Sequence, residues 1–190
     1  MEHCVCYTAK MIPKMYIVSG VNGVGKTSVM PSLRERLDSE HYVIHDFDER
    51  GVPDGADRTW RMSELKKWIE ISRDNAQKNL STIICGFTKI GDFEELNVPN
   101  APNVELILLH ADSETVRKRL EGRYTKDGVF DETQKVIGKP VTEFIEGNVW
   151  YSNKMLEEFQ EHNGTVIDTS DITPDEVAEQ IVKVISDSVT

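Results

Sequence analysis

The chain has 190 residues, and its 22 lysines and arginines against 33 aspartates and glutamates give a formal net charge of −11 at pH 7. This length fits a single domain with a sizeable core. The acidity argues against nucleic acid as an extended partner, because phosphate binding needs local positive charge. No stretch approaches the roughly 18 consecutive apolar residues of a membrane helix. The three cysteines are too few for a disulfide framework, and with no signal-like N-terminus they favour a cytoplasmic protein.

Residues 1–13 show no clear periodicity and end in a proline. We interpret them as an N-terminal leader, in part disordered, that precedes one domain over residues 14–190. Five short apolar runs rich in β-branched residues follow, at residues 15–18, 42–44, 82–85, 104–109 and 165–167. Runs without polar alternation are typical of strands that are buried on both faces.

Helical periodicity lies between these runs. Leu65 and Trp68 begin one apolar face, and Ile145 and Val149 begin a second. Residues 173–176 carry the residues of a capping box, with proline at the first helical position. The alternation predicts an α/β fold in which helices cover both faces of a parallel sheet and ligands bind at the carboxyl ends of the strands.

A glycine-rich segment follows the first apolar run. Residues 20–27 read GVNGVGKT and match the pattern G-x-x-x-x-G-K-[ST] in full, between a predicted strand and a predicted helix. In this pattern backbone N–H groups point at phosphates, the lysine reaches the β- and γ-phosphates, and the hydroxyl ligates Mg²⁺. Pro31 is expected to kink the following helix. The segment predicts an ATP and Mg²⁺ site, with Thr27 on the metal and nucleotide contacts at Gly20, Asn22, Gly23, Val24, Gly25, Lys26, Thr27 and Ser28.

Two acids end the second apolar run. Asp46 and Asp48 are two positions apart, so an extended chain directs both carboxylates to one face. This face lies opposite the glycine-rich segment 20–27, which we call the phosphate loop. Phosphoryl transfer needs an acid near Mg²⁺ and a carboxylate that orients the acceptor hydroxyl. We assign Asp46 to the metal, through water, and Asp48 to the acceptor. An acidic turn without a catalytic role is the alternative.

A Gly/Asp-rich loop leads from these acids into the next helix. Arg58 and Arg61 are candidates for binding an anionic group of the acceptor, and Trp60 is a candidate for a planar or sugar face. The alternative is that Asp57 or Thr59 caps the helix and that Trp60 packs in the interior.

Three segments resemble the P-loop small-molecule kinases of the adenylate-kinase and shikimate-kinase type, namely residues 20–27, 111–123 and 166–170. The resemblance implies a three-layer P-loop NTPase fold whose parallel sheet has the strand order 2-3-1-4-5. It also implies a lid at about residues 124–140 and transfer of the γ-phosphoryl group of ATP.

The resemblance further assigns roles to single residues. Arg119 and Arg123 would pack on adenine and hold phosphates, as catalytic residues beside Lys26 and Asp48, and Thr169 would lie next to the adenine. Without the resemblance, the two arginines are simply charges on a solvated helix face.

The end of the third apolar run resembles the Asp-Gly-Phe-Pro-Arg of adenylate-type kinases only in part. Gly86 and Phe87 match, whereas Cys85 replaces the acid and Thr88-Lys89 replaces Pro-Arg. We assign Gly86 and Lys89 to the acceptor site. Cys85 is interpreted as a small buried apolar group, which leaves the metal to Asp46.

The sequence thus predicts an ATP-dependent phosphotransferase that acts on a small hydroxylated or phosphorylated metabolite, such as a nucleoside, nucleotide or sugar acid. A monomer or homodimer without nucleic-acid or membrane partners is expected. The alternatives are a regulatory GTPase and a non-catalytic nucleotide-binding module. Residues 48–51 match D-x-x-G, but no N-K-x-D occurs, because Asn153-Lys154 lies within a helical pattern.

Overall fold

The computed structural model describes residues 12–96, 103–124 and 138–188, and these form an α/β domain around one parallel sheet. The sheet has the strand order β2-β3-β1-β4-β5, and each neighbouring pair is parallel. The predicted strand order is confirmed. The strands are β1 (Met15–Ser19), β2 (Tyr42–Asp46), β3 (Ser81–Cys85), β4 (Val104–His110) and β5 (Thr165–Asp168).

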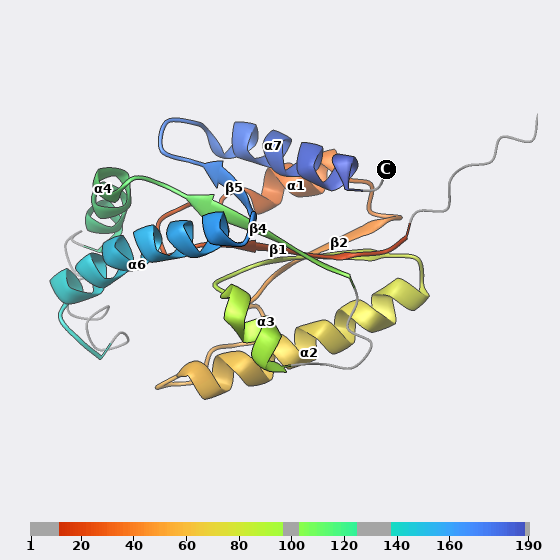
Figure 1. The fold of residues 1–190 in the computed structure, drawn as a ribbon, viewed down its shortest axis with the longest axis horizontal. Helices are drawn as coiled ribbons and strands as arrows, with labels where there is room; N and C mark the ends of the chain where they lie inside the picture. Colours follow the sequence, from red (N-terminus) through yellow and green to blue (C-terminus); the bar gives the residue numbers. More distant parts are fainter. Residues whose placement is uncertain (1–11, 97–102, 125–137, 189–190) are drawn as a thin grey trace, which may run out of the picture.

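Helices cover both faces of this sheet, with α1 and α7 above it and α2 and α3 below it in Figure 1. Helix α6 contacts β4 and β5, and α4 packs on α6. None of the described helices combines the length and the apolar character needed to cross a bilayer. The helices are α1 (Met30–Arg36), α2 (Arg58–Gln77), α3 (Ile90–Leu96), α4 (Ser113–Tyr124), α6 (Val141–Glu161) and α7 (Pro174–Asp187).

The central strand β1 is buried over its whole length and divides the core into two clusters. Tyr16 and Val18 belong to the larger cluster, together with residues of α1, α4, α6 and α7. Met15 and Ile17 belong to the smaller cluster, with residues of α2. Successive strand residues therefore face opposite layers, as the unalternating apolar run predicts. The sheet positions the end of β1 at its centre, where β3 and β4 flank it.

Pro31 does not kink an established helix as expected, because α1 begins only at Met30 and the proline lies in its first turn. A proline has no N–H to donate to the carbonyl four residues earlier. The carbonyl of Thr27 accepts instead from the Met30 N–H, at 3.3 Å. The phosphate loop is therefore joined to α1 by a turn.

The predicted helix boundaries are confirmed where a cap defines them. The Asp57 side chain accepts from the Trp60 N–H at the start of α2, so this aspartate is the cap. Thr173 and Glu176 form the predicted capping box of α7. Most of the predicted leader and of the predicted lid lies outside the described residues, and α3 was not assigned from the sequence.

Candidate active site

A cavity of about 1360 Å³ opens at the carboxyl ends of the strands. It is lined by the phosphate loop, the ends of β2 and β3, the start of α2, part of α4 and the turn after β5. Gly20 and Lys89 are not among its lining residues. The predicted site residues that line it are Asn22, Gly23, Val24, Gly25, Lys26, Thr27, Ser28, Asp46, Asp48, Arg58, Trp60, Arg61, Gly86, Arg119, Arg123 and Thr169.

Gly20 has a structural role at the point where β1 enters the loop. Its φ is +148°, and a Cβ at this position would lie 2.4 Å from the carbonyl oxygen of Leu109 in β4. A side chain is excluded both by this contact and by the backbone conformation. Gly20 thus fixes the course of the loop beside β4.

Arg119 and Thr169 hold the loop from behind. Arg119 donates to the Gly23 carbonyl at 3.3 Å and to the Thr169 carbonyl at 2.6 Å. The buried Thr169 hydroxyl donates to the Val24 carbonyl at 3.0 Å. Both residues therefore tie the loop to α4 and to the turn after β5. Their contacts with a nucleotide, which the resemblance implies, stay predictions.

Asn148 of α6 holds the tip of the loop, a role that no sequence motif predicts. Its Oδ1 accepts from the backbone N–H and the side-chain amide of Asn22, at 3.0 and 3.2 Å. Its own Nδ2 donates to the Phe144 carbonyl at 2.8 Å, which fixes the orientation of the amide. An asparagine on a helix is an ordinary surface residue in the sequence, so only the fold reveals this contact.

Lys26 faces the acids at the end of β2. Its ammonium donates to the Val21 carbonyl at 2.7 Å. Protein atoms crowd this group, and burial lowers the pKa of Lys26 to about 8 although Asp48 and Asp46 oppose the shift. The pKa of Asp48 is raised, first by burial and then by the neighbouring charge of Asp46. The lysine and the two carboxylates thus share one electrostatic environment.

The residues assigned to Mg²⁺ fit the chemistry of that ion. The Thr27 hydroxyl donates to Asp46 Oδ2 at 3.2 Å, so two oxygen ligands lie side by side. Mg²⁺ prefers oxygen and is typically bound by one or two protein groups together with phosphates and water. Among the described residues no group of three or more His, Cys, Asp and Glu side chains could hold a metal alone.

Arg58 and Arg61 line the cavity, but both already have carboxylate partners from α3. Arg61 donates to both oxygens of the buried Asp92, at 3.3 and 3.4 Å. Arg58 donates through both terminal nitrogens to the two oxygens of Glu95. No sequence pattern indicates these two acids, because the short α3 lacks the apolar periodicity from which a helix is predicted.

Lys89 does not line the cavity, and its role at the acceptor stays a prediction. Its ammonium lies 4.6 Å from the ring centre of Tyr151 on α6, in a cation–π contact outside the cavity lining. Gly86 does line the cavity. Cys85 is buried, and burial raises the pKa of its thiol to about 12. This confirms that Cys85 is a small buried group rather than a replacement for a catalytic acid.

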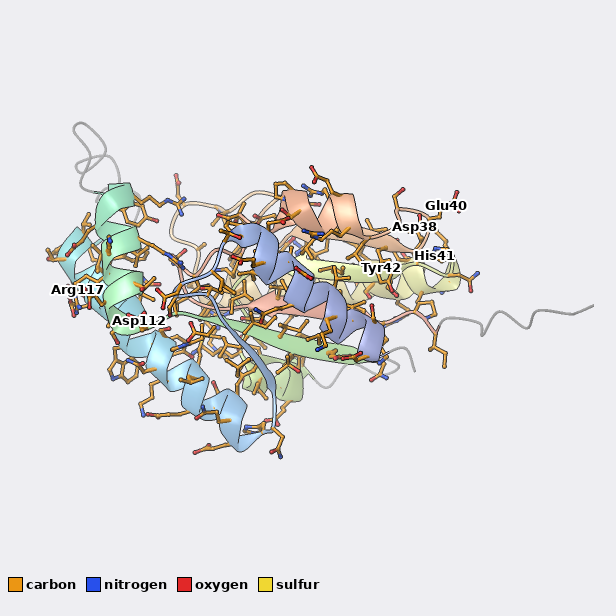
Figure 2. The ribbon with its side chains drawn as sticks, turned by 90° about the horizontal axis from the view of Figure 1, so that it is seen from above. Asp38, Glu40, His41, Tyr42, Asp112 and Arg117 are labelled. Carbon is orange, nitrogen blue, oxygen red and sulfur yellow. The ribbon has the colours of Figure 1, made fainter. Side chains whose placement is uncertain are left out.

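The basic residues of α4 divide between the cavity and the surface. Arg123 lines the cavity and lies 5.3 Å from the ring centre of Tyr124. Arg117 is at the outer flank of α4, as Figure 2 shows, and pairs with Glu146 of α6 at 2.8 and 2.9 Å. A surface ion pair therefore accounts for Arg117.

Comparison with known proteins places this site in a recognisable fold. No family model matches the chain. A protein of Pyrococcus furiosus described as "Putative adenylate kinase" is 25% identical over 177 residues, which cover 90% of this chain and 84% of that protein. The shikimate kinase of Acinetobacter baumannii superposes with a TM-score of 0.52 at 16% identity, covering 94% of this chain and 95% of the other. The APS kinase of Mycobacterium tuberculosis gives 0.61 at 13% identity, with 93% and 99% covered.

The strand order, the phosphate loop after the central strand and these similarities agree with one another. The predicted resemblance is confirmed: the chain has the fold of the P-loop small-molecule kinases.

Proposed function

We propose that this chain is an ATP-dependent, Mg²⁺-dependent kinase that phosphorylates a hydroxyl group of a small metabolite. The observation that carries the proposal is the juxtaposition of the loop residues Lys26 and Thr27 with Asp46 and Asp48 in one cavity. A loop that binds phosphates and a pair of acids are the two parts that phosphoryl transfer requires. Kinases among the similar proteins support the same reaction class.

The nucleotide would occupy the side of the cavity formed by the loop, α4 and the turn after β5. Backbone N–H groups of residues 23–27 and the Lys26 ammonium bind the phosphates, while the Asn22 N–H is held by Asn148. Arg123 reaches the same region from α4, while Arg119 keeps the loop in position. Ile172, Pro174 and Val177 give this side an apolar surface suited to the base.

Thr27 and Asp46 would hold Mg²⁺, which when bound neutralises charge on the phosphate oxygens. Asp46 is itself oriented, because its Oδ1 accepts the Asp48 N–H at 2.9 Å and its own N–H donates to Glu49 at 3.1 Å. The acid therefore cannot turn away from Thr27 without losing backbone contacts.

Asp48 would orient the acceptor hydroxyl and take its proton. In the transfer the hydroxyl oxygen bonds to the γ-phosphorus, the bond from that phosphorus to the β–γ bridging oxygen breaks, and ADP leaves. A raised pKa makes Asp48 a stronger base than an exposed aspartate. Arg58, Arg61 and Gly86 line the acceptor side.

The test is ADP release from ATP and Mg²⁺ with a panel of nucleosides, nucleotides, sugars and sugar acids. Lys26→Ala is expected to lower turnover by at least about a hundredfold with an unchanged circular dichroism spectrum. Lys118→Ala on the exposed face of α4 removes the same charge and keeps turnover. Asp48→Asn is expected to lower turnover more than ATP affinity. Acceptor-independent GTP hydrolysis would instead support a nucleotide switch, and full turnover in Lys26→Ala would refute the assignment.

A further inference from the structure

Arg58 lines the cavity, and its guanidinium already binds a carboxylate of the protein. Its Nη1 donates to Glu95 Oε1 at 3.1 Å, and its Nη2 donates to Glu95 Oε2. The two parallel bonds are the bidentate geometry in which a guanidinium binds carboxylates and phosphates. Glu95 thus fills the fork that an anionic group entering the cavity would use. The pair lowers the pKa of the Glu95 carboxyl, so Glu95 is charged at neutral pH.

The two acids of α3 differ in how easily they can leave their arginines. The Asp92 side chain is 1% exposed, and besides Arg61 it accepts the Lys89 backbone N–H at 3.2 Å. It is a fixed counter-ion, because a buried charge that loses its partner is costly. The Glu95 side chain is 57% exposed, and within the described part of the chain its ion pair and hydrogen bonds are with Arg58. Glu95 can therefore rotate into water at little cost.

The two arginines are matched one to one by the two acids of α3 while Glu95 is in place. Arg58 and Arg61 provide two positive charges, and Asp92 and Glu95 provide two negative charges. When Glu95 turns away, Arg58 keeps only Asp92 Oδ1 at 3.6 Å, an acid that it shares with Arg61, so the fork of Arg58 has a positive charge without a bidentate partner. That charge is complementary to a single carboxylate or phosphate group.

We propose that Glu95 is a specificity-determining residue, an exchangeable counter-ion that competes with an anionic group of the acceptor for Arg58. The inference rests on the proposed function, since it assigns this side of the cavity to the acceptor. It names the acceptor class as a hydroxylated compound with one carboxylate or phosphate group. An exposed ion pair contributes little free energy, so Glu95 weakens the binding of such an acceptor without preventing it.

The test compares Glu95→Gln with Glu94→Gln, which removes the same charge from an exposed neighbour in the same helix. Matched acceptors are gluconate with glucose and AMP with adenosine. Glu95→Gln is expected to raise kcat/KM for the anionic member about two- to fivefold, with no change for the neutral member. Glu94→Gln should change neither. In an Arg58→Gln background the effect of Glu95→Gln should vanish, because the competition acts through that arginine.

A binding measurement separates failure of this inference from failure of the proposed kinase activity. Inorganic sulfate is titrated by calorimetry into each variant, with AMPPNP and Mg²⁺ present to fill the phosphate loop. Tighter sulfate binding in Glu95→Gln that depends on Arg58 supports the inference even if no acceptor is phosphorylated. Equal binding in the wild type, Glu95→Gln and Glu94→Gln overturns it, as does a gain that persists without Arg58, whether or not the protein is a kinase.

Discussion

Replacing Gly86 with alanine tests how Asp46 and Asp48 reach the cavity. A Cβ at Gly86 would lie 2.0 Å from Phe47 Cβ and 2.8 Å from Phe47 Cγ. Ordinary carbon–carbon contacts are about 3.5 Å, so the ends of β2 and β3 must separate by about 1.5 Å. Phe47 stands between Asp46 and Asp48, and the separation therefore displaces both acids.

Phe47 cannot absorb this displacement alone, because its backbone is held on both sides. Its N–H donates to the Cys85 carbonyl at 2.9 Å, and its carbonyl accepts from the Trp68 indole at 3.0 Å. Overpacking of this kind costs about 1–3 kcal/mol of stability. A misplacement of about 1 Å at a reacting group lowers turnover about a hundredfold. ATP affinity should change little, since the phosphate loop follows a different strand.

The assay measures kcat, AMPPNP affinity and the melting temperature of Gly86→Ala beside Gly122→Ala, a position with no atom within 4 Å of an added Cβ. We expect Gly86→Ala to lose turnover and melting temperature while it retains AMPPNP binding. Gly122→Ala should keep the turnover and AMPPNP binding of the wild type, with an equal or higher melting temperature, because alanine favours a helix more than glycine does. Unchanged turnover and stability in Gly86→Ala would refute the close approach of Phe47. Loss of AMPPNP binding together with turnover would show that the damage is not confined to the acids.

Two further predictions concern other parts of the fold. Asn148→Ala should weaken AMPPNP binding about three- to tenfold by freeing the Asn22 amides, with little change in melting temperature. Asn153→Ala on the same helix is the control. Equal AMPPNP affinities in the wild type and both variants would contradict the role of Asn148 in holding the loop. Burial lowers the pKa of His110, whose Nε2 has no hydrogen-bond partner among the described residues. The unfolded chain therefore binds the proton first as pH falls through about 6.5, so stability should decrease from pH 7 toward pH 5, and His110→Gln should flatten that part of the melting-temperature profile. A wild type that becomes more stable on acidification would contradict the burial argument.

The parts of the structure that depend on residues close together in the sequence could be predicted from it. The strands follow from apolar runs, and the phosphate loop follows from eight consecutive residues in a strand–loop–helix context. The facing acids of β2 required one more step, the rule that ligands meet the carboxyl ends of parallel strands. The acceptor role of Lys89 stays a prediction, because it rests on a motif that this chain matches only in part. The Tyr151 ring that its ammonium contacts lies on a helix outside that motif.

Contacts between distant parts of the chain could not be predicted, and these contacts decide which cations remain for a ligand. The arginine residues of the cavity look equivalent in the sequence. In the structure Arg58 and Arg61 pair with carboxylates of α3, and Arg119 donates its hydrogen bonds to backbone carbonyls. Within the described part of the chain, no carboxylate lies within ion-pair distance of Lys26 or Arg123. In the proposed function, the negative charge of a triphosphate would therefore fall on these two side chains and on the loop amides, even in a protein whose net charge is −11.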